Sequence, residues 1–354
     1  MKLKHAYAVL ALGAMAGMVH AQDADKASVT LWGVADVNYG VTTNVAGKGT
    51  QVAAGQGGMY GSRLGVNGKS AKMANGLRAI FSAEGAVNPP YPSAFNFNRY
   101  AFVGLEGDFG RLRLGTTMRP YDDTAWNYEA LDSMAFSLGP VSSWRAFGAN
   151  TKAIRYNTND LGNKTVLDMF LSAGGVAGKS SAGTRYGAQV TTTLGVTDVL
   201  AYYERSNDAD GKQTQTTQGW NDSTGNVLAL MTRTNIDNVK LYAGVHRYGA
   251  PDAAPTDPTR TQIWHVGASV QATTDLNLKL GYYALSHAGH GVTKAGAKTF
   301  AAAAQYNLGF AWVYAVAGHL ANEANGTVDI TGANGAQPKG SSQNGLKVGL
   351  TYVF

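Results

Sequence analysis

Apolar and polar residues alternate with a period of two along most of this 354-residue chain, and this pattern constrains the fold more than any other feature. The clearest case is the C-terminus, where one face carries Leu346, Val348, Leu350, Tyr352 and Phe354. Successive side chains of a β-strand point to opposite faces, so the period predicts strands with one apolar and one polar face. Helical periodicity is almost absent, and the chain is therefore predicted to be all-β.

Sixteen strands are predicted, joined alternately by tight turns and by long loops rich in Gly, Ser, Asn, Thr and Asp. The long connections include 41–58, 206–224, 249–260 and 322–342. Short turns at one end and long loops at the other are typical of a transmembrane barrel. The predicted strands lie near 29–39, 60–67, 77–84, 98–107, 110–116, 151–158, 163–173, 183–194, 197–206, 225–236, 238–248, 261–273, 275–287, 297–308, 311–321 and 346–354.

The N-terminus has the organisation of a secretory leader. Lys2 and Lys4 precede a short apolar run over 6–19, and small residues follow at the expected cleavage point. The run is too short to span a bilayer as a helix, so residues 1–21 are predicted to be a cleaved signal peptide. The rest of the chain, 22–354, has no dividing linker and is predicted to form a single barrel domain.

Several kinds of site are excluded by composition. The chain has no cysteine, so no disulfide, thiol nucleophile or thiolate metal site is possible. The net charge of +6 is too diffuse to indicate nucleic-acid binding. His287 and His290 lack a third metal ligand nearby, and no glycine-rich turn opens a helix that could hold a phosphate. We therefore predict no enzyme, no metal and no cofactor.

A spanning sheet must close on itself, because backbone groups in lipid find no partner outside the protein. A barrel of about sixteen strands is wide enough to hold water, which lets the inward face carry charged residues. Aromatics near the strand ends are interpreted as interfacial girdles, and alternation places many of the tyrosines toward lipid. The girdle candidates are Tyr39, Tyr60, Tyr202, Tyr203, Tyr248, Trp264, Tyr282, Tyr283, Tyr306, Trp312, Tyr314, Tyr352 and Phe354.

Five stretches resemble the general porins of Gram-negative bacteria, in particular the trimeric type of the β-proteobacteria. They are Ser-Val-Thr-Leu-Trp-Gly-Val-Ala-Asp at 28–36, Ser-Arg-Leu-Gly-Val at 62–66, Phe-Asn-Phe-Asn-Arg at 95–99, Gly-Arg-Leu-Arg-Leu-Gly at 110–115 and Tyr-Val-Phe at 352–354. The resemblance implies a sixteen-stranded antiparallel barrel, a homotrimer, and a multi-pass location among the lipids of the outer membrane. It also implies passive diffusion of small hydrophilic solutes and ions.

The resemblance implies two further features. A third external loop, about Thr117 to Ala149, would fold into the lumen and form a constriction. The terminal Phe354 resembles the signal read by the outer-membrane assembly machinery.

Charged side chains that face each other across such a passage would set its selectivity. Arg63 lies within a matching stretch. Arg99 falls on the same face of its predicted strand as the apolar Val103, so Tyr100 takes the inward position there. We expect a basic wall and an acidic loop with a mild preference for anions. The wall candidates are Arg63, Arg78, Arg113 and Arg155, with Arg111 at the same parity, and the loop candidates are Arg119, Asp122, Asp123, Glu129, Asp132 and Arg145.

The sequence does not exclude two other functions. One is a substrate-specific outer-membrane channel lined by an aromatic track or a dense basic cluster. The other is a structural or adhesin barrel with a plugged lumen. Only residues 22–27 separate the predicted cleavage site from the first strand, so no plug domain of a gated transporter is expected there.

Overall fold

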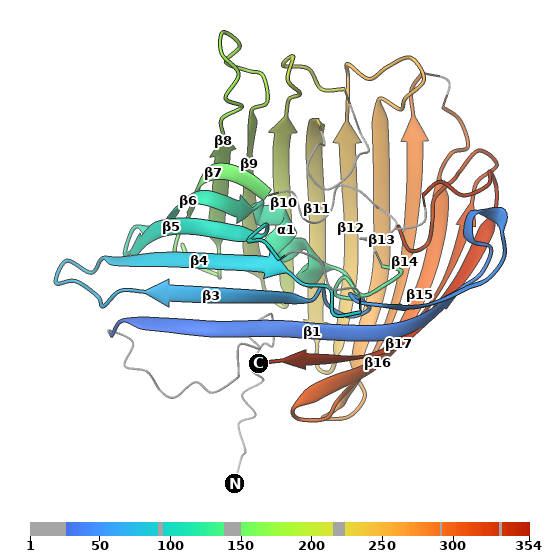
Figure 1. Ribbon diagram of the computed structural model, residues 1–354, viewed down its shortest axis with the longest axis horizontal. Helices are drawn as coiled ribbons and strands as arrows, with labels where there is room; N and C mark the ends of the chain where they lie inside the picture. The colour runs from blue at the N-terminus through green and yellow to red at the C-terminus, as the bar shows by residue number, and fades with distance from the viewer. Residues whose placement is uncertain (1–25, 91–94, 138–149, 215–223, 291, 333–334) are drawn as a thin grey trace.

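The computed structural model describes residues 26–90, 95–137, 150–214, 224–290, 292–332 and 335–354. The predicted signal peptide and Arg145 lie outside these ranges. Within them the chain forms a single antiparallel sheet that curves round on itself (Figure 1). None of the helices described is long and apolar enough to span a bilayer.

The elements follow one another as a meander with three short helices. The helical segments are η1 (Val45–Gly47), α1 (Pro120–Thr124) and η2 (Ala125–Tyr128). The strands are β1 (Ser28–Thr42), β2 (Gln51–Gly55), β3 (Arg63–Lys69), β4 (Arg78–Ala86), β5 (Tyr100–Gly107), β6 (Gly110–Met118), β7 (Asn150–Asn157), β8 (Val166–Ser172), β9 (Arg185–Leu194), β10 (Thr197–Ser206), β11 (Gly225–Ile236), β12 (Val239–Gly249), β13 (Arg260–Gln271), β14 (Leu276–Ala288), β15 (Ala297–Asn307), β16 (Ala311–Asn322) and β17 (Ser342–Val353).

The first strand closes the barrel. On one side β1 pairs with β17, from Val34 opposite Val353 to Thr42 opposite Gly345. On its other side it pairs with β3 along its first half and with β2 along its second half. The segments β2 and β3 are thus two parts of one interrupted strand, and the predicted sixteen-stranded antiparallel barrel is confirmed.

The interruption of the second strand was not predicted, because residues 41–58 were interpreted as one long loop. The structure instead places η1 and β2 in that stretch. The chain leaves the sheet after Gly55 and rejoins it at Arg63. Gly57 has a φ of +72°, a left-handed conformation that glycine adopts without steric cost.

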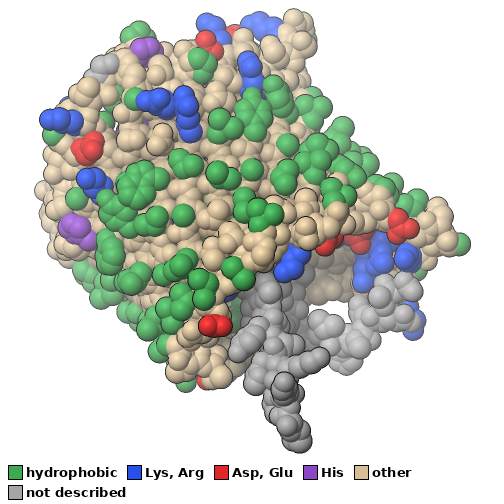
Figure 2. Space-filling model, turned by 180° about the vertical axis from the view of Figure 1, so that it is seen from behind, with side chains coloured by type: hydrophobic (Ala, Val, Ile, Leu, Met, Phe, Trp, Pro, Cys, Tyr) green, Lys and Arg blue, Asp and Glu red, His purple; other side chains and the backbone are tan. Residues whose placement is uncertain are grey.

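The outer face of the barrel is apolar and the inner face is polar. Alternate residues such as Val29, Val103 and Val348 are 68%, 64% and 55% exposed, respectively. Side chains of this kind spread over the outer wall in Figure 2. A soluble sheet would bury such a face, whereas a transmembrane barrel turns it to lipid. The face that alternates with it carries the carboxylates and guanidiniums described below.

The girdle interpretation is wrong for several of the aromatics. Tyr39, Trp264 and Tyr306 are exposed on the outer wall, at 69%, 43% and 44%. Four of the proposed girdle residues instead face the barrel interior and are at most 3% exposed. These four are Tyr202, Tyr248, Tyr283 and Tyr314. Their rings lie at or near the inner loop described next, which alternation along a single strand does not reveal.

Candidate functional site: a charged wall facing an inner loop

After β6 the chain turns into the barrel, and we call its described part, residues 119–137, the inner loop. It begins with α1 and η2, which lie inside the barrel in Figure 1. Tyr121, Leu131, Met134 and Phe136 of this loop are at most 1% exposed. They belong to one apolar cluster with inward residues of β10 to β16, such as Leu200 and Ile263. The inward fold expected of the third loop is confirmed for this part of the chain.

Glycines of the wall make room for the side chains of the inner loop. A Cβ atom on Gly267 would lie 2.5 Å from the Cβ of Ala130. A Cβ on Gly318 would lie 2.6 Å from the Cβ of Phe136, and one on Gly345 would lie 2.4 Å from Cζ of the same ring. These separations are shorter than van der Waals contact. The loop therefore sits in notches that only glycine leaves open.

Filling one notch is expected to loosen the inner loop. In Gly345→Ala the new methyl group displaces the Phe136 ring, and overpacking of this kind costs about 1–3 kcal/mol. We expect faster hydrogen exchange or proteolysis at residues 131–137 than in the wild type. Gly61→Ala is the matched control, because a Cβ there would meet no atom within 4 Å. Equal protection in the two variants would contradict the notch interpretation.

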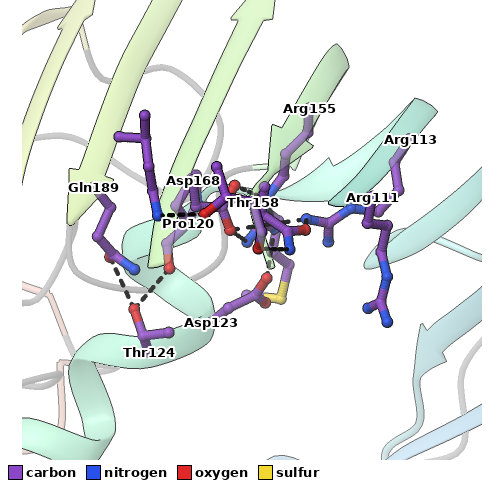
Figure 3. A network of polar contacts seen from close by, with 12 residues as sticks. Arg111, Arg113, Pro120, Asp123, Thr124, Arg155, Thr158, Asp168 and Gln189 are labelled. Carbon is purple, nitrogen blue, oxygen red and sulfur yellow. Dashed lines mark hydrogen bonds and ion pairs between the residues drawn. The ribbon is translucent and has the colours of Figure 1, made fainter. Parts of the chain in front are cut away.

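Arg155 is the centre of the first charged group on the wall. It donates from Nε and Nη2 to the carboxylate of Asp168, at 2.9 and 2.7 Å, and from Nη1 to the Met118 carbonyl at 2.7 Å. Its Nη1 also bonds Asp123 of the inner loop, which accepts a hydrogen bond from Tyr100 as well. Figure 3 shows this network between the strands and α1. Asp123 therefore ties the loop to the wall rather than facing it from a distance.

Arg113 adjoins this group from the neighbouring strand. Its Nη2 donates to Asn157 Oδ1 at 2.7 Å and lies 3.8 Å from Asp168. The register places Arg113 directly opposite Arg155. Two guanidiniums thus share one wall carboxylate at this level of the barrel.

A second charged group surrounds Glu84. Arg63 Nε lies 3.9 Å from the Glu84 carboxylate, and Arg99 forms a direct ion pair with it. Arg99 was left out of the predicted site because of its parity. The structure starts β5 at Tyr100, so Arg99 lies just before the strand and its side chain can turn inward. Alternation applies only within a strand, so it does not place Arg99. The signal that could have identified Arg99 as a site residue is the short run 95–99, which resembles porins.

A third charged group is buried where the inner loop leaves the wall. Arg119 donates to Asp122 at 2.6 and 3.0 Å and to Glu204 at 3.1 and 3.3 Å. Arg185 lies 3.7 Å from the same Glu204. Burial alone would lower the pKa of Arg119, but the two carboxylates more than offset it and hold that pKa above its ordinary value. Arg119 and Asp122 are 2% and 3% exposed, so they fasten the loop and do not line a passage as predicted.

Glu129 and Asp132 contact the wall from the far end of the loop. Glu129 is fully buried and accepts hydrogen bonds from the Tyr283 hydroxyl at 2.6 Å and the Leu131 amide at 3.0 Å. The predicted place of Glu129 in the constriction is therefore wrong in this structure, since it has no exposed surface. Asp132 is bonded to Lys279 of β14 and keeps a 27% exposed side chain.

Glu129 is expected to make docking of the inner loop depend on pH. Burial raises its pKa from 4.5 to about 7, despite the hydrogen bonds that it accepts. Because the buried site favours the protonated form of Glu129, this group contributes to the stability of the docked loop. The contribution is fully present below pH 4.5 and is lost as the pH rises to about 7. The contribution is up to about 3 kcal/mol, by the usual 1.36 kcal/mol per pKa unit.

Hydrogen exchange of the inner loop at pH 5 and pH 8 measures this effect. The wild type is expected to lose protection at pH 8 by more than the intrinsic exchange rate accounts for. Glu129→Gln keeps the shape and one acceptor but cannot ionise, so its protection is expected to change less between the two values. An equal pH dependence in wild type and variant would assign the effect to other groups.

Asp36 of β1 links the broken second strand to the tip of the inner loop. Its carboxylate accepts hydrogen bonds from the amides of Gly58 and Met59, at 3.0 and 3.1 Å. It also accepts from the Tyr314 hydroxyl at 3.0 Å and the Thr351 hydroxyl at 2.7 Å. The Gly58 carbonyl in turn accepts the amide of Ala135 at 2.9 Å. One buried carboxylate thus holds the segment on which the loop tip rests.

The remaining predicted residues lie apart from this centre. Arg78 and Arg111 both face Glu106 near the turn end of the barrel, at 3.9 and 2.5 Å. Phe354 pairs its backbone with Gly33 at 2.9 and 3.1 Å and stacks on Tyr352. Among the described residues no cluster of His, Asp and Glu could hold a metal ion.

Comparison with solved structures shows the same fold elsewhere. The anion-selective porin from Comamonas acidovorans matches with a TM-score of 0.80 at 23% identity, over 93% of this chain and all of that chain. OmpT of Vibrio cholerae, in a structure described as the trimer form, matches with a TM-score of 0.65 at 15% identity, over 93% and 100%.

Comparison with curated sequences and family models gives the family. Outer membrane porin protein 32 of Delftia acidovorans is 29% identical over 203 residues, which are 57% of this chain and 54% of that protein. The chain thus spans about half the length of this curated relative. The model of the Gram-negative porin family matches residues 6–325, most of the sequence. The chain therefore belongs to the Gram-negative porin family.

Proposed function

We propose that this protein is an outer-membrane channel for passive diffusion of small hydrophilic solutes and ions, with a preference for anions. The observation that carries the proposal is the excess of guanidiniums where the wall meets the inner loop. In the three groups around Glu84, Asp168 and Glu204, six arginines meet five carboxylates, which leaves one net positive charge in these groups. The arginines are Arg63, Arg99, Arg113, Arg119, Arg155 and Arg185, and the carboxylates are those of Glu84, Asp122, Asp123, Asp168 and Glu204.

Two lysines on other strands add to this excess. Lys240 of β12 and Lys347 of β17 face inward, and neither forms an ion pair within 4 Å among the residues described. Lys347 lies 5.9 Å from the centre of the Phe136 ring. Charge of one sign in a passage with low-dielectric walls favours ions of the other sign. The relative from Comamonas carries anion selectivity in its name, which agrees with this sign.

We assign the charged residues of the site two roles. Arg63, Arg99, Arg113 and Arg155 would set the field along the wall, with Asp123 and Asp132 as the loop acids nearest the passage. Arg119, Asp122 and Glu129 would hold the inner loop in place. Arg78 lies outside this centre and would contribute to the field at the turn end. No nucleophile with an adjacent base enters the proposal, so we propose a channel rather than an enzyme.

We also propose that the channel is a homotrimer. The wall from β3 to β8 has strands of 7 to 9 residues, whereas those from β11 to β17 have 11 to 13. The wall of shorter strands, β3 to β8, would be covered by a neighbouring subunit, since its outer residues Val103 and Leu114 are 64% and 46% exposed. The similar structure of Vibrio OmpT carries a trimer in its description. Phe354 would serve as the assembly signal.

Liposome swelling with sugars of increasing size tests the proposed function. Refolded protein is expected to admit small sugars and to exclude oligosaccharides above a limit, without saturation. Saturable entry of one solute would replace the general channel with a substrate-specific one. Absence of any swelling would favour a structural barrel and contradict the proposal.

A further inference from the structure

Three aromatic side chains lie on the inward face of the wall formed by the first strands. Trp32 of β1 and Tyr100 and Phe102 of β5 alternate with exposed apolar residues such as Leu31 and Val103. Each of the three aromatic side chains remains partly exposed. The inward tyrosines of the later strands, by contrast, are covered by the inner loop. The first strands thus present aromatic rings to the passage.

The indole of Trp32 lies flat across the neighbouring strand. The register places Trp32 opposite Gly65 of β3. A Cβ atom on Gly65 would lie 2.8 Å from both Cε2 and Nε1 of the indole, so only glycine leaves this place to the ring. Gly65 is in turn opposite Glu84 of β4, and Glu84 is opposite Tyr100. The indole therefore extends along this row toward the charged group around Glu84.

Guanidinium groups stack on two of the rings. Cζ of Arg63 lies 5.9 Å from the centre of the Trp32 ring, and Cζ of Arg113 lies 6.0 Å from the centre of the Phe102 ring. Arg113 belongs to the network of Figure 3, in which it lies beside Arg155. A planar guanidinium that stacks on one ring can stack on a second ring with its other face. We call Trp32, Arg63, Phe102 and Arg113 the ring–guanidinium track.

Two N–H donors of this track lack an acceptor. Trp32 Nε1 and Arg113 Nε are buried and have no hydrogen-bond partner among the residues described, and Arg113 as a whole is 6% exposed. A buried donor without a partner carries a free-energy cost, which a ligand with oxygen acceptors would offset. In addition, Arg63 and Arg99 share the single carboxylate of Glu84, which leaves one positive charge beside the indole.

We propose that the ring–guanidinium track binds aromatic carboxylates on their way through the channel. The ring of such a solute would stack on the Trp32 and Arg63 pair. Its carboxylate would accept hydrogen bonds from the guanidiniums of Arg63 and Arg99, whose planar donors match a carboxylate. One net positive charge suits a solute with one negative charge. The proposal rests on the proposed anion-preferring channel and names a class of anion that this channel would favour.

Blocking of the chloride current in planar bilayers at neutral pH tests the track. Benzoate and cyclohexanecarboxylate are the two probes, because both are ionised monoanions of similar size and only benzoate is aromatic. An aromatic contact strengthens binding by roughly two- to tenfold. We therefore expect wild-type channels to be half-blocked by benzoate at a concentration about fivefold lower than by cyclohexanecarboxylate.

Four variants locate the effect. Trp32→Leu removes the ring, and Gly65→Ala keeps the indole but displaces it from its place on β3. Trp32→Phe is the conservative variant that restores an aromatic ring. Trp264→Leu is the matched control, because Trp264 faces outward and is 43% exposed. Heat-dependent mobility in gels shows that each variant is folded.

The preference for benzoate is expected to fall to within about twofold in Trp32→Leu and Gly65→Ala, and to persist in Trp32→Phe and Trp264→Leu. Equal blocking of wild-type channels by both probes would overturn the proposal and leave the channel itself standing. A wild-type preference that survives in both Trp32→Leu and Gly65→Ala would also overturn it. A wild type that carries no chloride current would refute the proposed function, and the track would fall with it.

Discussion

Replacing Arg63 and Arg99 with glutamate is expected to turn the anion preference of the channel into a cation preference. The two guanidiniums now share the carboxylate of Glu84, one at 3.9 Å and the other in a direct ion pair. The double substitution changes this group from one net positive charge to three negative ones. Such charges interact by about 1 kcal/mol each with an ion 4 Å away even in water, so the permeability ratio should change by about tenfold or more.

Reversal potentials across planar bilayers under a salt gradient measure this change. The control is Lys72→Glu with Lys164→Glu, two exposed positions in turns, away from the inner loop. Salt screens charges over about 8 Å at physiological strength, so these positions should leave the selectivity as it is. An unchanged anion preference in the Arg63 and Arg99 variant would show that the selectivity is set elsewhere in the passage.

Asp36→Asn is expected to be the most destabilising isosteric change in the barrel. The Asp36 carboxylate accepts two hydroxyl and several amide hydrogen bonds, and an asparagine would turn an NH2 group toward some of those donors. Each buried donor left without a partner costs about 1–3 kcal/mol, so the total is about 3 kcal/mol or more. The Gly58 carbonyl would shift, and with it the Ala135 amide of the inner loop.

Urea unfolding, monitored by gel mobility, measures the change in stability. Single-channel recording reports whether the inner loop stays in place. We expect a lower unfolding midpoint together with frequent conductance fluctuations. Glu106→Gln is the matched control, because Glu106 is also an inward strand carboxylate but bonds arginines far from the loop. If channels of the Asp36→Asn variant fluctuate no more than those of the wild type, the inner loop does not depend on this link.

The strands and the wall arginines could be predicted because they depend on local alternation. Arg113 alternates with Leu112 and Leu114, and Arg155 alternates with Ile154 and Tyr156, so parity alone turns both arginines inward. The outer exposure of Val348 and Leu350 follows from the same rule. A barrel is unusually favourable for such prediction, since one face of every strand meets lipid and the other meets water.

The partners of the loop residues could not be predicted, because they come from strands distant in the sequence. Glu129 meets Tyr283 across 154 positions, and no local pattern marks it as buried. Tyr202 and Tyr283 lie on the inward faces of β10 and β14, together with Glu204 and Lys279, and the inner loop covers them, which removes them from the expected aromatic girdles. The break in the second strand likewise depends on Asp36, whose role appears only when three separate segments converge on its carboxylate.

The reversal potential of the wild type in a planar bilayer tests most directly whether the protein is an open channel that prefers anions. Under a tenfold potassium chloride gradient, we expect discrete conductance steps and a reversal potential with the sign set by chloride. A reversal potential with the sign set by potassium, or a membrane that stays silent after insertion, would contradict it.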